Sequence, residues 1–239
     1  MNKNAAYFNH FQLKLLILLT IIVNFSGILH PILRNDDPVL YANIAKHMVQ
    51  SGDWLNLIFN QTDWLDKPHF PFWLTAISFK IFGINTFAYV LPGFLFHLLG
   101  AYYTYLLARD LYGSEDVGLL SSILYLSALH LLMSSIDVRA EAYLLGEIMG
   151  AVYYWYKYNE SPNIASKYLV LGALFTAMAL MTKGLFVLVT IFSGLFSQLL
   201  YKKEWTNFVK PKWFLAFILS LLFIAPEIWA LYVQFDSHP

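Results

Sequence analysis

The chain has 239 residues, of which 59% are hydrophobic and only 13% are charged, and its mean hydropathy is +0.56. A water-soluble domain carries about 25% charged residues, so this composition excludes an ordinary soluble domain and predicts a membrane protein. Equal numbers of acidic and basic residues argue against a nucleic-acid partner, and the lack of cysteine excludes disulfides, thiolate catalysis and Cys-based metal sites.

Apolar runs bounded by charged residues repeat along the whole chain. A membrane-spanning helix needs about 17–25 such residues. We predict about seven spans, which in chain order are Leu15–Leu33, Ile81–Ala108, Val117–Ile136, Ala142–Tyr156, Tyr168–Thr182, Leu185–Tyr201 and Trp213–Phe235. The shortest runs reach a spanning length if they tilt or extend past their bounding charges. The predicted fold class is therefore an all-α integral membrane protein.

The basic residues of the short loops predict the orientation. With a cytoplasmic N-terminus, more Lys and Arg residues fall on the cytoplasmic side than on the opposite side, as the positive-inside rule requires. Arg139 and Lys183 are exceptions, because each lies at the non-cytoplasmic end of a predicted span. A cation placed there against the rule indicates a functional reason for its position.

Residues 34–80 form a polar, non-cytoplasmic loop between the first two predicted spans. Asn35-Asp36-Asp37-Pro38 predicts a turn into an amphipathic helix, Val39–Gln50, which Ser51-Gly52-Asp53 ends. The proline-containing stretch Asp66–Trp73 then leads into an apolar helix, Leu74–Phe82. The tryptophans spaced through the loop favour the level of the lipid headgroups. We therefore expect two interfacial helices joined by a rigid charged elbow.

The charged residues of this loop suit chemistry at a membrane surface. A carboxylate such as Asp36 or Asp37 can act as a general base, which typically contributes about 10²–10⁴-fold to a rate. Lys67 can neutralise a phosphate as a point charge. Together they suit a reaction in which a lipid phosphate leaves while its tail stays in the bilayer. The alternative is that the aspartates only begin the helix and that Lys67 only snorkels.

A series of short motifs carries a family resemblance. In chain order they are Asp37-Pro-Val-Leu-Tyr41-Ala42, Asp66-Lys67-Pro68 with Phe72-Trp73-Leu74, Ser135-Ile136-Asp137, and Thr182-Lys183-Gly184. The series resembles the GT-C membrane glycosyltransferases, and within them the branch of aminoarabinose (lipid A) transferases and protein O-mannosyltransferase-like enzymes. Members of the family are longer, so we expect residues 1–239 to be the N-terminal part of a GT-C-like transmembrane module, with residues 34–80 as its interfacial loop.

The resemblance implies an inverting transfer of a sugar from a polyprenyl-phosphate donor to a lipid, glycan or protein acceptor on the non-cytoplasmic face. The catalytic candidates that it implies are Asp37, Asp36 and Asp137. The donor-binding candidates that it implies are Lys67, Asp66, Tyr41, Arg139, Lys183 and His69. The resemblance leaves a divalent metal ion open as a cofactor. Asp66 and His69, however, replace the Glu and the second Pro that the family usually has there, and this departure argues against a metal-binding role for the elbow. The implied location is the inner (plasma) membrane of a bacterium.

The predicted topology places these candidates on one side of the membrane. Asp37, Lys67, Asp137, Arg139 and Lys183 come from four distant regions of the sequence, and all of them fall at non-cytoplasmic ends of spans. We therefore predict that they line a shared cavity. One further carboxylate, Glu141, follows Asp137 by one helical turn and is expected to share that cavity.

Two rival interpretations remain. In the first, the chain is a transporter or flippase of a lipid-linked substrate, and Asp137, Glu147 and Glu227 lie on its pathway. In the second, it is a truncated subunit without activity of its own. Glu147 lies within Gly146–Gly150, where small residues four apart predict close helix contact. We therefore favour a hydrogen-bonded carboxyl between helices for Glu147 over a catalytic role.

Overall fold

The computed structural model describes residues 8–29, 33, 37–160, 166–203 and 210–236. Most of them are helical. The described helices are α1 His10–Leu29, α2 Asp37–Ser51, α3 Phe70–Phe82, α4 Thr86–Tyr112, α5 Glu115–Ser127, α6 Leu129–Ile136, α7 Ala140–Glu160, α8 Ser166–Lys183, α9 Val187–Tyr201, α10 Pro211–Phe223, α11 Ala225–Leu231 and a π-helical turn, Tyr232–Asp236. A short antiparallel hairpin, β1 Ile58–Phe59 with β2 Thr62–Asp63, lies between α2 and α3.

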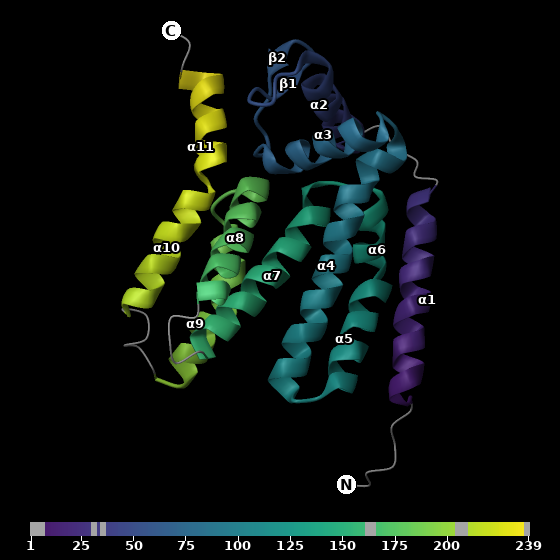
Figure 1. Ribbon diagram of the computed structural model, residues 1–239, viewed down its shortest axis with the longest axis vertical. Helices are drawn as coiled ribbons and strands as arrows, with labels where there is room; N and C mark the ends of the chain where they lie inside the picture. The colour runs from purple at the N-terminus through teal and green to yellow at the C-terminus, as the bar shows by residue number, and fades with distance from the viewer. Residues whose placement is uncertain (1–7, 30–32, 34–36, 161–165, 204–209, 237–239) are drawn as a thin grey trace.

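The long helices stand side by side, with α1 at one edge of the bundle and α10 and α11 at the other (Figure 1). Residues 37–82, which comprise α2, the hairpin and α3 and which we call the platform, lie together across one end of this bundle. Helix α1 begins at the opposite end. The platform is thus the polar loop of the sequence folded against the ends of the helices that follow it.

The platform contains the two expected helices, but both begin earlier than predicted. Helix α2 starts at Asp37, and α3 starts at Phe70 instead of Leu74. Pro71 caused the second error, because proline is tolerated in the first turn of a helix and does not exclude one. The hairpin was not predicted; its turn residues Asn60 and Gln61 both have positive φ, as a type I′ turn requires.

Each predicted span overlaps at least one described helix, although Ile81–Ala108 begins in α3 and crosses the break before α4. Fewer of the helices are long and apolar enough to span a membrane by themselves. Within the described part of the chain, α1 and α4 could each cross a membrane, and the number rises to four if the bent pairs α5–α6 and α10–α11 each count as one span. Helix α9 has 15 residues, short of the usual spanning length. The membrane-protein class is thereby supported, whereas the count of seven stays a prediction.

The two bent pairs have different causes. Helices α10 and α11 meet at 44°, and Pro226 follows directly after the break. Helices α5 and α6 meet at 59° around Ala128, where the sequence has no proline. The Ser127 hydroxyl donates to the main-chain oxygen of Ile123 at 2.7 Å, and this kind of back-bonding bends helices. The second bend directs α6 towards the platform end of the bundle.

Glycines bring α4, α7 and α8 into close contact. A methyl group on Gly146 of α7 would lie 2.3 Å from the main-chain oxygen of Phe96 in α4. A methyl group on Gly150 would lie 2.5 Å from the ring of Phe175 in α8. The close packing predicted for this pair is therefore present, and the two glycines serve two different neighbouring helices.

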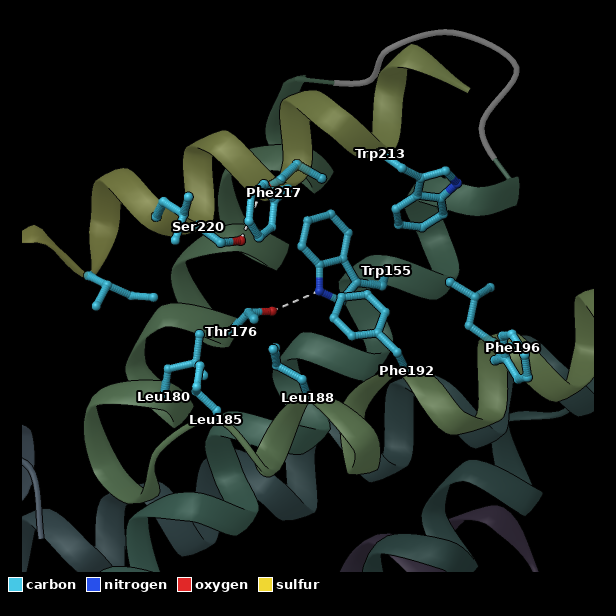
Figure 2. Close-up of a pocket in the computed structure, with 14 residues that line it drawn as sticks. Trp155, Thr176, Leu180, Leu185, Leu188, Phe192, Phe196, Trp213, Phe217 and Ser220 are labelled. Atoms are coloured by element: carbon cyan, nitrogen blue, oxygen red, sulfur yellow. Dashed lines mark hydrogen bonds between the residues drawn. The ribbon is translucent and has the colours of Figure 1, made fainter. Parts of the chain in front are cut away.

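An apolar cavity of about 350 Å³ lies among α7, α8, α9 and α10. Figure 2 shows the side chains of Leu180, Phe192 and Phe217 around it, and Trp155 donating its indole N–H to Thr176 at 2.8 Å. Its lining is almost wholly hydrocarbon and aromatic. Because a catalytic site needs several convergent polar groups, this cavity is not a candidate active site.

Candidate functional site

A second cavity, of about 560 Å³, lies between the platform and the ends of α6, α7 and α8. Both acidic and basic side chains line it. Its lining residues are Asp37, Tyr41, Lys67, His130, Met133, Ser134, Asp137, Arg139, Glu141 and Lys183. The shared cavity expected from the topology is therefore present, and it collects residues from every one of the predicted motifs.

Arg139 is the central cation of the cavity. Its guanidinium contacts Asp37 of α2 at 3.4 Å and Asp137 at 3.4 Å through different nitrogens. Asp37 lies in the first turn of α2, where the helix dipole favours a carboxylate. Asp137 ends α6, and its Oδ1 is buried without a hydrogen-bond partner among the described residues. The arginine thus joins the platform to the bundle.

The short turn that carries Asp137 and Arg139 is fixed from α4. Tyr89 of α4 donates its hydroxyl to the main-chain oxygen of Val138 at 2.7 Å, and Val138 itself is buried. Both charged neighbours of Val138 therefore point away from the core and into the cavity. Such pre-positioning lowers the cost of arranging charges around a substrate.

Tyr41 presents its hydroxyl end to the same space. Its ring packs edge-on against Trp64 and Phe72, with centroids 5.8 and 5.2 Å apart, and the side chain is 5% exposed. Burial, reinforced by the negative charge of Asp37, raises the pKa of the Tyr41 hydroxyl. The group therefore stays protonated and can donate a hydrogen bond.

The end of α8 supplies a further cation of the cavity, Lys183. Lys183 occupies the last turn of α8 and forms an ion pair with Glu141 of α7. The preceding residue, Thr182, donates to Glu147 of α7 at 2.9 Å. Gly184 then adopts a positive φ of 84°, which turns the chain away. Two neighbouring residues of α8 are thus attached to α7, and the ammonium lies at the cavity.

The charged elbow of the platform contributes Lys67 alone. Lys67 forms an ion pair with Asp66, whose carboxylate is mostly exposed to solvent. His69 is fully buried, and its ring lies between Glu227 and the main-chain oxygen of Leu55. Asp66 and His69 are therefore missing from the lining described for the cavity. Asp36 lies outside the described residues.

Three lining residues were missed in the sequence, namely His130, Met133 and Ser134, and all belong to α6. A signal for two of them was present. His130, Ser134 and Asp137 follow one another at intervals of four and three residues, which places them on one face of a helix. The intervening apolar residues concealed this polar stripe within a predicted span.

The carboxylates of the cavity do not assemble a metal site. Within the described ranges, no three His, Asp or Glu side chains come together as ligands for one ion. Arg139 lies between Asp37 and Asp137 and supplies positive charge where a cation would otherwise balance them. The described side chains therefore do not fit the divalent ion that the resemblance left open.

The two carboxylates buried in the bundle bind neighbouring helices. Glu147 accepts from Thr182 of α8, as its predicted packing role requires. Glu227 of α11 accepts from the ring and the main-chain N–H of His69. Both are buried, at 0% and 5% exposure. These contacts link helices to one another and give the transporter interpretation no specific support.

A helical membrane protein with a charged cavity under an interfacial platform belongs to a recognisable class, the GT-C type of membrane-embedded transferases. Residues 66–229 match the family model of the dolichyl-phosphate-mannose-protein mannosyltransferases. Since the match covers well over half of the chain, the chain belongs to this family. The resemblance inferred from the short motifs is thereby confirmed.

The relatives indicate the branch. The chain is 27% identical, over 87% of its length, to the undecaprenyl phosphate-alpha-4-amino-4-deoxy-L-arabinose arabinosyl transferase 2 of Proteus mirabilis. It is 31% identical over 60% of its length to an uncharacterized protein of Aquifex aeolicus. It spans 37% and 28% of these two relatives. Their whole-protein activities are therefore not carried over directly.

Solved structures support the same fold. The crystal structure of ArnT from Cupriavidus metallidurans in the apo state superimposes with a TM-score of 0.82, at 22% identity, covering 95% of this chain and 43% of ArnT. The ArnT structure bound to undecaprenyl phosphate gives 0.80 at 21% identity, covering 95% of this chain and 42% of ArnT. At such identities the likeness establishes the GT-C fold of this part of the chain.

Proposed function

We propose that the chain carries the catalytic and donor-binding part of a glycosyltransferase that uses a polyprenyl-phosphate-linked sugar. The observation that carries this proposal is the cavity under the platform, where Asp37 and Asp137 face Lys67, Arg139 and Lys183. A carboxylate base next to several fixed cations is what transfer from a lipid phosphate needs. The names of the relatives support undecaprenyl phosphate as the carrier.

The proposed reaction is a single displacement with inversion at the anomeric carbon. A carboxylate of the cavity takes the proton of an acceptor hydroxyl, and the acceptor oxygen forms a bond to the anomeric carbon. The bond from that carbon to the phosphate oxygen breaks, and its electron pair remains on the polyprenyl phosphate. Negative charge therefore moves to the leaving phosphate, and catalysis requires cations positioned there in advance.

Residue roles follow from the contacts. Asp37 is the proposed base, because it lines the cavity from the platform and its side chain is 47% exposed. Arg139, Lys67 and Lys183 neutralise the leaving phosphate, and Tyr41 donates a hydrogen bond to it. Asp137 holds Arg139 in place and is the alternative base, because it lines the same cavity and its side chain is 36% exposed.

The membrane arrangement is part of the proposal. We place the N-terminus in the cytoplasm, about seven spans in the inner membrane of a bacterium, and the platform on the non-cytoplasmic face. Support comes from the bias of basic residues and from the position of the platform opposite the start of α1. The isoprenoid tail then stays in the bilayer while its phosphate enters the cavity. The acceptor is a lipid, glycan or protein on that face.

The substitution Asp37→Asn tests the proposed base. In membranes containing the protein and supplied with undecaprenyl phosphate-4-amino-4-deoxy-L-arabinose, we expect release of undecaprenyl phosphate to slow by about 100-fold or more. Binding of undecaprenyl phosphate should persist, because the cations remain. Asp53→Asn is the matched control, since Asp53 lies in the platform but binds only its own loop, through Leu55 and Asn56. Equal turnover by Asp37→Asn and the unaltered protein would refute the role of Asp37.

A further inference from the structure

A buried contact joins the C-terminal part of the chain to the elbow of the platform. Glu227 of α11 accepts the main-chain N–H of His69 at 3.1 Å and faces the His69 ring nitrogen Nδ1 at 2.9 Å. The other ring nitrogen of His69 lies 3.0 Å from the main-chain oxygen of Leu55. His69 is fully buried and Glu227 is 5% exposed. The two side chains are thus held by each other within the protein interior.

The π-helical turn at the end of the same C-terminal segment makes a second attachment. Gln234 donates to the main-chain oxygen of Leu57 at 3.1 Å and accepts the Leu57 N–H at 3.1 Å, as a neighbouring strand would. It also donates to the carboxylate of Asp63 in β2 at 3.0 Å. Glu227 and Gln234 therefore hold the platform from α11 and the π-helical turn, across more than 150 residues of sequence.

The attachment at His69 determines where Lys67 lies. Only Pro68 separates the two residues, and its ring fixes one backbone dihedral of the connection. The contacts described for Lys67 Nζ are with its neighbour Asp66, which moves together with it. The fixed main chain at His69 therefore sets the position of the Lys67 ammonium in the cavity.

We propose that Glu227 and His69 are positioning residues that hold Lys67 towards the phosphate of the polyprenyl-phosphate donor. This inference rests on the proposed function and adds a role for α11, a helix that does not line the cavity. Glu227 lies in the first turn of α11, directly after the 44° bend from α10. Glu227 thus acts on the donor through the elbow, at a distance from the reacting atoms.

A binding experiment with undecaprenyl phosphate tests this role in the detergent-solubilised protein. We expect Glu227→Ala to raise the Kd by about tenfold, and Lys67→Ala to raise it at least as much. In the double variant, the loss should equal that of Lys67→Ala alone, because Glu227 acts through Lys67. Glu227→Gln keeps one oxygen for the His69 N–H and should raise the Kd by only about threefold; it also serves as the test variant if Glu227→Ala does not fold.

Asp110→Asn is the matched control. Asp110 is a carboxylate near the far end of α4 that accepts hydrogen bonds from Arg109 and from Lys157 of α7. We expect its substitution to lower the thermal midpoint about as much as Glu227→Gln does, and to leave the Kd for undecaprenyl phosphate unchanged. A merely structural role of Glu227 would give both variants the same behaviour in the two measurements.

The outcomes separate this inference from the function on which it rests. An unchanged Kd in Glu227→Ala beside a raised Kd in Lys67→Ala would overturn the positioning role and leave the proposed function intact. Losses that add in the double variant would also overturn it, because Glu227 would then act independently of Lys67. Failure of the unaltered protein to bind, or equal binding by Lys67→Ala, would instead overturn the proposed function.

Discussion

At the scale of single residues, Arg139 is the side chain on which the cavity depends most. It is the one described cation that contacts a carboxylate of the platform and a carboxylate of the bundle. Two different nitrogens of its guanidinium make these contacts, which a planar, multiply donating group permits. Loss of these two contacts should shift Asp37 and Asp137 together and should change the space available to a donor phosphate.

Arg139→Lys tests that dependence while keeping the charge. A single ammonium on a flexible stem does not reproduce the two separate contacts, so we expect the transfer rate to fall by about tenfold or more. Release of undecaprenyl phosphate from its linked sugar measures the rate. Arg109→Lys is the control, because Arg109 pairs with its neighbour Asp110 near the other end of α4 and should tolerate the exchange. Wild-type rates in both variants would contradict the bridging role.

At the scale of elements, the crossing of α4 and α7 sets the position of the residues that line the cavity from the bundle. Gly146 faces the main chain of Phe96 so closely that no larger residue fits without moving one helix. Helix α7 carries Glu141 at its start, and the turn before α7 carries Arg139. If the two helices moved apart, Arg139 and Glu141 would therefore be displaced from the cavity.

Gly146→Ala measures the importance of this contact. Overpacking against a main chain costs about 1–3 kcal/mol, which outweighs the gain in helix propensity. We expect a lower thermal midpoint in detergent, by about 2–4 °C per kcal/mol. Gly194→Ala in α9 is the matched control, since nothing lies within 4 Å of the added methyl group and the variant should be neutral or stabilised. A midpoint for Gly146→Ala at or above that of Gly194→Ala would refute the argument.

At the scale of the whole molecule, the two ends of the bundle differ in kind. One end carries the platform and the charged cavity. The other end carries the start of α1, the α4–α5 turn and the basic residues near the end of α9, among them Lys202. The positive-inside rule predicts that the second end is cytoplasmic and hence that the cavity lies outside.

The natural absence of cysteine makes this orientation directly testable. Ser51→Cys places a thiol on the exposed end of α2, and Tyr112→Cys places one at the far end of α4, where the side chain is 73% exposed. In intact cells freed of their outer membrane, we expect a membrane-impermeant maleimide to label the first and not the second. After lysis it should label both, which controls for reactivity. Labelling with the reverse pattern would place the cavity in the cytoplasm.

Much of this arrangement was predictable because its signals are local. The apolar runs and their bounding charges located the helices, and the alternation of sides brought Asp37, Lys67, Asp137 and Lys183 to one end of the bundle. The motif series correctly indicated the family. The roles of these residues in donor binding and base catalysis stay predictions, as do the seven spans and the orientation.

The sequence by itself determined the class of the protein, the order of its helices and the end at which its charges gather, because hydrophobic length and charge position act within each segment. Only the tertiary structure decided which partner each charge has. His69, expected near the donor, is buried against Glu227, and Arg139 joins two aspartates that lie 100 residues apart in the sequence. Such pairings depend on how distant helices pack, and no local pattern specifies them.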